Sequence, residues 1–152
     1  IGAAASVWRA YKNSNEKKKI AILLFNDTLV DQVIGQIKRF FPDVECELVT
    51  GSIKKSTKLD YSKILVGTSA LCYLKDYVAD FLIVDEQHKF SREQREAVSG
   101  SHTNILEATA TAIPRSIALI THGGMNVSII RQSHAKKTIK TSLVDDDSKF
   151  AM

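Results

Sequence analysis

The sequence predicts an α/β domain with a mostly parallel β-sheet that is covered by helices on both faces. Short apolar runs alternate with segments of helical periodicity along most of the 152 residues. The apolar runs are nearly continuous, which is typical of strands buried on both faces of a parallel sheet. Hydrophobic residues make up 44% of the chain and charged residues 25%, a composition that fits one globular domain with a sizeable core.

The first half of the chain supplies three predicted strands. Residues 21–25 form an apolar run, and the apolar spacing over residues 27–41 predicts a helix that ends before Pro42. Further strands are expected at residues 45–50 and 63–68. The first residues of the chain have a helical pattern in which we expect Trp8 to face the core.

The second half continues the alternation and places Ser91 at a helix start, where a serine oxygen can cap the first N–H groups. The elements predicted in this half are a short helix at 70–77, a strand at 81–84, a helix at 91–98, a strand at 104–109, a helix from Pro114 to about residue 121, and strands at 127–130 and 138–144.

Charge and cysteine content restrict the classes of function. The net charge of +4 permits a polyanionic partner without requiring one. No apolar run reaches the roughly 18–20 residues of a membrane span, and the N-terminus lacks the pattern of a signal peptide. Cys46 and Cys72 show no metal-binding spacing, so we interpret them as core residues or free thiols of a cytoplasmic protein.

The strand at 81–84 is followed directly by the polar run Asp85, Glu86, Gln87 and His88. Ligands of parallel α/β sheets bind at the carboxyl ends of the strands. An aspartate there can hold the Mg²⁺ that bridges nucleotide phosphates, and a neighbouring glutamate can polarise a water molecule. The pattern favours a nucleotide hydrolase, although a solvated strand end remains the simpler alternative.

A second polar segment, ATATAIPR, follows the strand predicted at 104–109. The hydroxyl groups of Thr109 and Thr111 are expected to lie near the acids or near His88, across neighbouring strand ends. A polar turn before a helix that starts at Pro114 is the alternative interpretation.

Together, VDEQHKF, TATAIPR and GGMNVSII resemble the motifs of superfamily 2 helicases, most closely the RecG type of branched-DNA translocase. LVTGSIKKS and VGTSAL resemble two further segments of that family. The transcription-repair coupling translocase shares the same two main motifs and is a close relative. The resemblance implies a RecA-like P-loop NTPase fold and an ATP-dependent DNA helicase acting in DNA repair and recombination.

The resemblance also implies roles for residues at the strand ends. Asp85 would bind Mg²⁺, Glu86 would activate water, and His88 would connect the nucleotide site to the TAT segment. That segment would couple hydrolysis to movement on DNA through Thr109, Thr111 and Arg115. The residues expected to contact the DNA phosphate backbone are Thr50, Gly51, Lys54, Lys55, Gly67 and Thr68.

The sequence departs from the family pattern in several places. No G-x-x-x-x-G-K-[ST] loop for ATP phosphates occurs, so the first strand and the P-loop are expected to be missing and the fragment alone to be inactive. We therefore expect an unpaired edge beside residues 81–84. Residues 1–144 would be part of a first motor domain, and residues 145–152 a polar tail or the start of a linker to the second motor domain. Asn26 stands where the family has a proline.

Two other functions remain open. The chain could be a non-catalytic RecA-like relic that serves as a DNA- or protein-binding module. It could also be a metal-dependent hydrolase built on Asp85, Glu86 and His88, although adjacent side chains of a strand face opposite ways and converge poorly on one ion.

Overall fold

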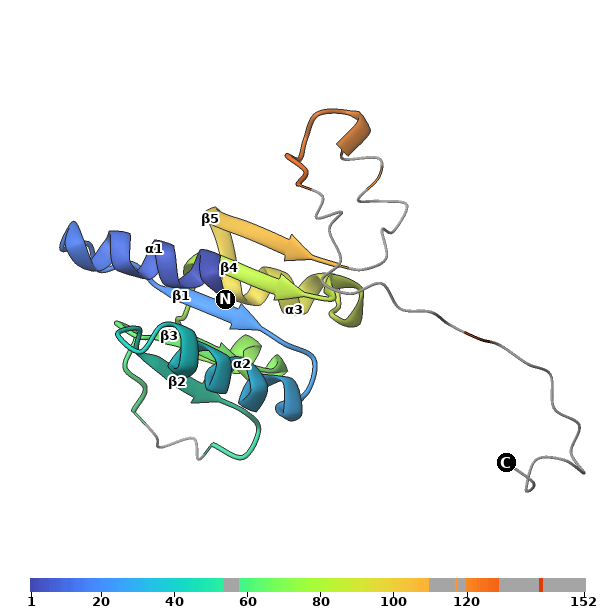
Figure 1. Cartoon of the computed structure of the whole chain (residues 1–152). Helices are drawn as coiled ribbons and strands as arrows, with labels where there is room; N and C mark the ends of the chain where they lie inside the picture. Colours follow the sequence, from blue (N-terminus) through green and yellow to red (C-terminus); the bar gives the residue numbers. More distant parts are fainter. Residues whose placement is uncertain (54–57, 110–116, 118–119, 129–139, 141–152) are drawn as a thin grey trace, which may run out of the picture. The chain divides into compact units, whose positions relative to one another are not determined.

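The computed structural model describes residues 1–53, 58–109, 117, 120–128 and 140. The chain divides into two units, Ile1–Pro114 and Arg115–Met152. Every helix and strand whose bounds are described lies in the first unit (Figure 1).

Helices and strands alternate through the first unit as the sequence predicts. In chain order they are α1 (Gly2–Asn13), β1 (Ile20–Leu23), α2 (Asp27–Phe40), β2 (Cys46–Val49), β3 (Ile64–Gly67), the 3-10 helix η1 (Ser69–Tyr73), β4 (Ala79–Asp85), the 3-10 helix η2 (Gln87–Lys89), α3 (Arg92–Val98) and β5 (Ser99–Ala108).

The five strands form one parallel sheet in the order β2-β3-β1-β4-β5. β1 is therefore the central strand, and its neighbours β3 and β4 come from later in the sequence. This arrangement confirms the predicted α/β fold class. It also brings the carboxyl ends of all five strands to one edge of the sheet.

The central strands β1 and β3 are buried on both faces, and because successive strand residues point to opposite sides, they contribute to two cores. Ile20 and Ile22 of β1 pack in a core with α1 and α2, which lie in front of the sheet in Figure 1. Ala21 and Leu23 pack in a second core with η1 and α3 on the opposite face. Trp8 of α1 belongs to the first core, as predicted, and its indole N–H donates to the Ser62 carbonyl oxygen at 3.1 Å.

Two helix starts are fixed by side-chain caps. The Asn26 side chain accepts a hydrogen bond from the Leu29 N–H at 2.8 Å, which defines the start of α2. Ser91 caps α3, as predicted, and forms a reciprocal capping box with Gln94. Such caps satisfy N–H groups that have no partner inside the helix.

Replacing Ser91 with alanine is expected to lower the free energy of unfolding by about 1 kcal/mol, because the Gln94 N–H loses its acceptor. Chemical denaturation followed by circular dichroism measures this loss. Ser101→Ala, an exposed serine outside any helix, is the matched control and should change stability by less than about 0.5 kcal/mol. Equal stability of the two variants would contradict the role of the cap.

The expectation of an unpaired edge beside residues 81–84 is wrong. β4 pairs with β1 on one side and with β5 on the other, and Phe81 to Asp85 align with Asn104 to Ala108. The reason is that α3 leads directly into β5 and returns the chain parallel to β4. At the irregular start of β5, the Thr103 hydroxyl accepts a hydrogen bond from the Gly100 N–H at 2.7 Å and donates one to the Ala79 carbonyl oxygen at 2.6 Å. These two bonds connect the start of β5 to β4.

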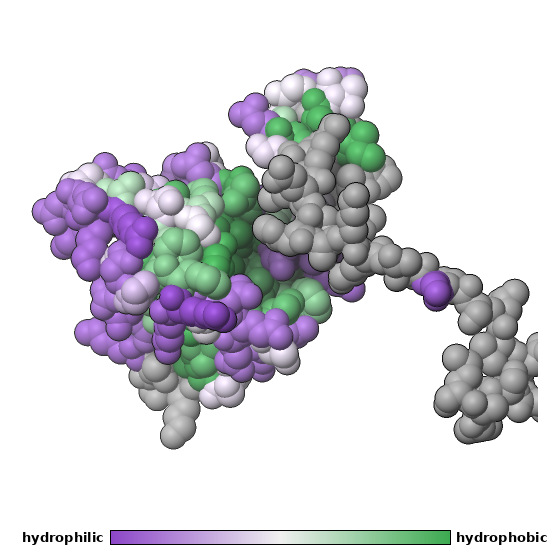
Figure 2. Space-filling view, viewed as in Figure 1, coloured by the Kyte–Doolittle hydropathy of each residue, from purple (hydrophilic) through white to green (hydrophobic). Residues whose placement is uncertain are grey.

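The outer part of β5 is less covered than the centre of the sheet. Ile105 and Leu106 are 47% and 42% exposed, although their side chains point to opposite faces. Figure 2 shows hydrophobic residues reaching the surface near the β4–β5 side of the sheet.

Other predictions were met in part. The helix predicted at 70–77 is the shorter η1. Ile117, Ile120 and Thr121 are helical, near the end of the helix predicted from Pro114 to residue 121. Val127, Ser128 and Lys140 do not lie in strands, and the remaining residues of the two late predicted strands are outside the described part of the chain.

Both cysteines are free and half-buried, in agreement with the sequence-based interpretation. Burial raises the pKa of the Cys46 and Cys72 thiols, which lowers the fraction of thiolate. Among the described residues, no helix is both long and apolar enough to cross a membrane.

Candidate functional site

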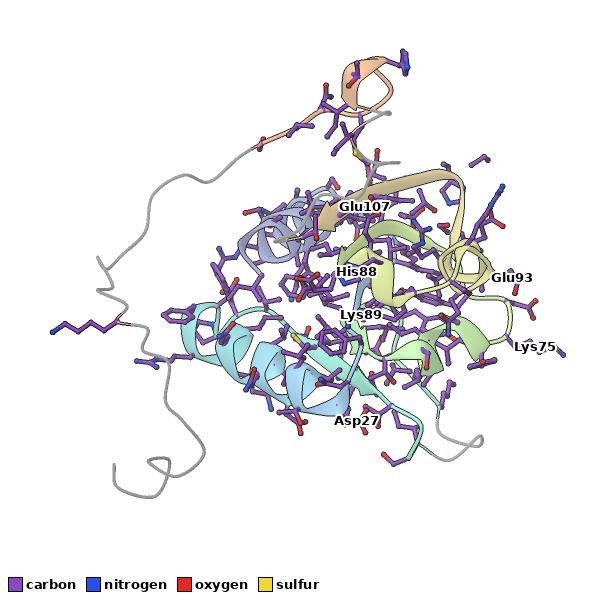
Figure 3. The ribbon with its side chains drawn as sticks, turned by 90° about the vertical axis from the view of Figure 1, so that its right-hand side faces the viewer. Asp27, Lys75, His88, Lys89, Glu93 and Glu107 are labelled. Atoms are coloured by element: carbon purple, nitrogen blue, oxygen red, sulfur yellow. The ribbon has the colours of Figure 1, made fainter. Side chains whose placement is uncertain are left out.

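The predicted site residues that the structure describes gather at the carboxyl edge of the sheet. Figure 3 looks at this edge and labels residues from several elements and loops around it. From one side to the other, the strand ends carry Thr50 and Gly51 after β2, Thr68 after β3, Glu86 after β4, and Thr109 after β5. A parallel sheet produces this convergence because all its strands end at the same edge.

The acid pair stands at the end of β4. Asp85 is the last residue of the strand and is half-buried. Glu86 adopts a left-handed conformation, with φ 51° and ψ 58°, which is unusual for a residue with a Cβ atom and costs on the order of 1–3 kcal/mol. This turn takes Glu86 out of the strand, so the alternation of side chains does not extend to it.

Glu86 connects the acid pair to two other predicted residues. Its N–H donates to the Ala108 carbonyl oxygen at 2.9 Å, which brings it beside the start of the TAT segment. Its carboxylate lies 3.3 Å from Nδ1 of His88, and both side chains are partly exposed. The structure thus brings Glu86, His88 and the residue preceding Thr109 together. Thr111 and Arg115 lie outside the described residues.

The donor set of the acid pair suits magnesium. Mg²⁺ prefers oxygen ligands and retains several waters, so one carboxylate such as that of Asp85 is sufficient. Within the described residues, no group of three or more His, Cys, Asp or Glu side chains converges as a metal centre. The metal-dependent hydrolase considered above needs such a group, so these residues do not support it. The sequence contains no glycine-rich loop for the β- and γ-phosphates of ATP, and its residues alone do not fit that part of the nucleotide.

The β2 and β3 side of the edge holds the predicted DNA-contacting residues. Thr50 is buried, and its hydroxyl lies 2.8 Å from the Ser52 hydroxyl. The Thr68 N–H donates to the Val49 carbonyl oxygen at 3.1 Å, so this amide already has a hydrogen-bond acceptor at the end of β2. Their contacts with DNA stay a prediction, as do those of Lys54 and Lys55, which lie outside the described residues.

Gly67 is required at this position by close packing between strands. A Cβ atom added there would lie 2.1 Å from the Val49 carbonyl oxygen and 2.9 Å from the Val49 Cβ. No side chain fits between these atoms. Packing between β2 and β3 therefore explains why a glycine occupies position 67, independently of any contact with DNA.

An open groove of about 1010 Å³ lies beside these residues, between the ends of β2 and β3 and η1. Thr68 and Gly51 line it together with Lys58 and Lys75. Lys75, labelled in Figure 3, follows η1 and was missed by the sequence analysis, because an isolated exposed lysine gives no local signal. Lys58 and Lys75 place positive charge near the ends of β2 and β3, whereas the acid pair follows β4.

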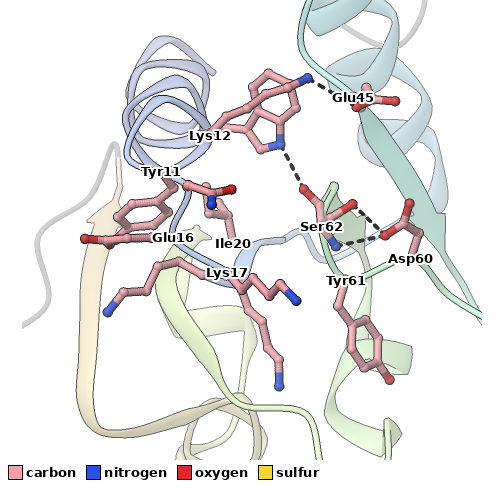
Figure 4. Close-up of a pocket in the computed structure, with 13 residues that line it drawn as sticks. Tyr11, Lys12, Glu16, Lys17, Ile20, Glu45, Asp60, Tyr61 and Ser62 are labelled. Atoms are coloured by element: carbon pink, nitrogen blue, oxygen red, sulfur yellow. Dashed lines mark hydrogen bonds and ion pairs between the residues drawn. The ribbon is translucent and has the colours of Figure 1, made fainter.

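A second hollow, of about 540 Å³, lies near the amino ends of β1 and β3 (Figure 4). Several of its polar groups have partners: the Trp8 N–H donates to Ser62, the Lys12 ammonium lies 3.7 Å from the Glu45 carboxylate, and Asp60 accepts from Ser62. This hollow is at the opposite edge from Asp85. We therefore assign the candidate site to the carboxyl edge.

Comparison with known proteins identifies the family. A family model described as "Type III restriction enzyme, res subunit" matches residues 2–114, about three quarters of the chain. The chain belongs to this family. The match spans every strand of the sheet and both predicted motif segments up to Pro114.

This chain is also similar to proteins named "ATP-dependent DNA helicase RecG". It is 33% identical over 136 residues to the protein of Streptococcus pneumoniae, covering 80% of this chain and 20% of that protein. It is 33% identical over 144 residues to the Bacillus subtilis protein, covering 84% and 21%. The resemblance to the RecG type that the motifs indicated is thereby confirmed. The chain spans about a fifth of the length of these relatives.

The structure is similar to one described as "Crystal structure of the C-terminal part of Fun30 ATPase domain". The TM-score is 0.46 at 14% sequence identity, with 67% of this chain and 39% of that chain covered.

Proposed function

We propose that this chain is part of the first motor domain of an ATP-dependent DNA helicase or branched-DNA translocase that acts in cytoplasmic DNA repair and recombination. The observation that carries the proposal is the hydrogen bond from the Glu86 N–H to the Ala108 carbonyl oxygen. It joins the DEQH segment to the start of the TAT segment, the two segments that would hydrolyse ATP and respond to DNA. The relatives named as helicases support the same function.

The proposed roles follow the geometry of the carboxyl edge. Asp85 would hold Mg²⁺, which bridges and neutralises nucleotide phosphates when bound. Glu86 would orient and polarise the attacking water, with His88 beside its carboxylate. Thr109, Thr111 and Arg115 would transmit the change to the DNA, and a second motor domain would complete the nucleotide site.

The DNA would lie across the β2 and β3 side of the edge. Its phosphate backbone would contact the chain near Thr50, Gly51, Gly67 and Thr68 and be attracted by the lysines of the 51–60 loop. Branched or forked DNA is the proposed partner. The alternative is a non-catalytic relic that binds DNA or protein with the same surface; ATP hydrolysis by the full-length protein separates the two.

Binding of DNA by the chain is expected to be weak, independent of sequence and strongly dependent on salt, because phosphate contacts release counterions and carry no base information. Fluorescence anisotropy with two labelled duplexes of unrelated sequence, titrated over a range of salt concentrations, measures this. Lys54→Gln with Lys55→Gln should reduce the salt slope by about 2, since each lost phosphate contact on duplex DNA contributes about 0.9.

The matched control removes two exposed lysines at the opposite edge of the sheet, Lys17→Gln with Lys18→Gln. It lowers the net charge equally and should leave the slope nearly unchanged. An equal loss in both double variants would show that only overall charge matters. Salt-independent binding, or a strong preference for one duplex, would also contradict the proposed contact.

A further inference from the structure

An ion pair joins α3 to the end of β5, next to the candidate site. Nη1 of Arg95 lies 3.4 Å from Oε1 of Glu107, and the two side chains are only 26% and 15% exposed. Of the ion pairs that the structure describes, this one is the least exposed, whereas the Arg92–Glu96 pair on the same helix is 71% and 59% exposed. Breaking a partly buried pair leaves one charge without a partner in a poorly solvated place, which costs more than breaking a surface pair.

Glu107 lies one residue before the contact that joins the two motif segments. It aligns with Val84, near the end of β4, and Val84 packs in the core on the α3 side of the sheet. The next residue, Ala108, accepts the hydrogen bond from the Glu86 N–H at 2.9 Å. Figure 3 labels Glu107 and His88 at this edge. An ion pair at Glu107 therefore acts on the strand end that carries the Ala108 carbonyl group.

The backbone of Arg95 is itself held in place. Its N–H donates to the carbonyl oxygen of Ser91, the capping residue of α3, at 3.3 Å. Its own carbonyl oxygen accepts a hydrogen bond from the hydroxyl of Ser99, the first residue of β5, at 2.7 Å. The guanidinium is thus presented from a helix that is anchored at both ends, and a side chain on such an element can fix its partner precisely.

These contacts close a ring that includes the turn at Glu86. From Glu86 the chain runs through η2 into α3, the Arg95 side chain reaches Glu107, and Ala108 returns to the Glu86 N–H. A displacement of the end of β5 therefore acts on this turn, because both are attached to the same helix. The left-handed conformation of Glu86 persists only while its surroundings hold it, so the turn is sensitive to such a displacement.

The ion pair is made by a single contact. Nε of Arg95 is buried and has no hydrogen-bond partner among the described residues, so the guanidinium reaches Glu107 through Nη1. The separation of 3.4 Å exceeds the roughly 2.7–2.9 Å of a tight charge-assisted hydrogen bond, and the two-pronged geometry that arginine can form with a carboxylate is not used. A small movement of β5 is enough to tighten or release a contact of this kind.

We propose that Arg95 is a positioning residue for ATP hydrolysis. Its ion pair with Glu107 keeps the TAT segment, which follows Ala108, in a fixed position relative to Glu86, so that the glutamate stays aligned with the attacking water. The inference rests on the proposed function and adds to it a residue that acts through Glu107 rather than on the nucleotide. The sequence gives no local signal for this role, because the two partners are 12 residues apart.

The variants Arg95→Gln and Glu107→Gln, made in a full-length protein that carries this chain, each remove one charge of the pair and keep a polar side chain. Each is expected to lower kcat for DNA-stimulated ATP hydrolysis by about 10-fold, since misplacing a catalytic group by about 1 Å can cost up to about 100-fold. KM for ATP should stay within about twofold, because no residue proposed to bind nucleotide is changed. Steady-state rates with branched DNA over a range of ATP concentrations give both constants.

Arg92→Gln is the matched control, because it breaks the exposed pair with Glu96 on the same helix. Its kcat and KM should stay close to those of the unchanged protein, since exposed ion pairs contribute little. The double variant Arg95→Gln with Glu107→Gln should lose no more activity than either single variant, because both changes remove the same link. Exchanging the charges, with Arg95→Glu and Glu107→Arg together, should recover most of the rate.

Hydrogen exchange provides a measurement that does not depend on ATP hydrolysis. The Glu86 amide is protected by its hydrogen bond to Ala108. Mass spectrometry of peptides that cover Glu86 in the full-length protein should show faster exchange in Arg95→Gln and unchanged exchange in Arg92→Gln. The physical reason is that a loosened end of β5 opens this hydrogen bond more often.

The outcomes separate this inference from the proposed function. If the unchanged protein hydrolyses ATP and Arg95→Gln keeps its kcat, the positioning role is wrong while the proposed function stands. The role is also wrong if Arg92→Gln loses as much activity, or if the losses of the two single variants multiply in the double glutamine variant, which decides the matter even where the charge exchange does not fold. If the unchanged protein does not hydrolyse ATP, the proposed function fails and the inference fails with it. Rates are compared below the unfolding temperature of the least stable variant, so that a loss of rate is not a loss of fold.

Discussion

Replacing Glu86 with glutamine in a full-length protein that carries this chain is expected to lower DNA-stimulated ATP turnover by about 100-fold or more, the usual contribution of a general base. Glutamine has nearly the same shape as glutamate but cannot accept a proton from water. The backbone hydrogen bond from residue 86 to Ala108 does not depend on the side chain, so the loop should keep its conformation. Asp85 remains in place, and binding of magnesium nucleotide should be retained.

Steady-state ATP hydrolysis with branched DNA measures the rate, and a fluorescent nucleotide measures binding. Glu93→Gln is the matched control, because Glu93 is an exposed glutamate on α3 and has no place in the proposed site (Figure 3). Its rate should be close to that of the unchanged protein. If Glu86→Gln kept most of the rate, Glu86 would not be the base. If neither the unchanged protein nor the control hydrolysed ATP, the non-catalytic alternative would be favoured.

Replacing Gly67 with alanine is expected to destabilise the chain by about 3 kcal/mol or more, at the upper end of the range for overpacking a buried site. The added Cβ would meet the Val49 carbonyl oxygen at 2.1 Å. The obstacle is backbone of the adjacent strand, so a rotamer change cannot relieve it. β2 and β3 would have to separate, and the Thr68–Val49 hydrogen bond would be strained with them.

Urea unfolding monitored by circular dichroism measures this effect. Gly35→Ala is the control, because Gly35 lies inside α2 and an added Cβ there meets nothing within 4 Å. Alanine is preferred over glycine in a helix interior by about 1 kcal/mol, so this variant should be as stable as the original chain or more stable. A Gly67→Ala variant of unchanged stability would show that β2 and β3 are not packed this closely.

Local sequence patterns determined most of the elements. The near-continuous apolar runs became β1, β3 and β4, because such segments bury both of their faces in a covered sheet. The alternating segment at residues 45–50 became β2. The start of α3 at Ser91 was predicted because its capping box involves residues only three positions apart. The position of the acid pair directly after a strand was also a local property, and it was sufficient to predict which edge of the sheet carries the candidate site.

The tertiary structure alone decided which strands are neighbours. The pairing of β4 with β5 aligns residues about 23 positions apart, such as Phe81 with Asn104, and local patterns did not predict this register. The close approach at Gly67 and the left-handed turn at Glu86 have the same origin. Periodicity and caps act over a few residues, whereas these contacts depend on how whole elements pack. The sequence therefore determined the elements and the chemistry at their ends, and packing decided which of those ends meet.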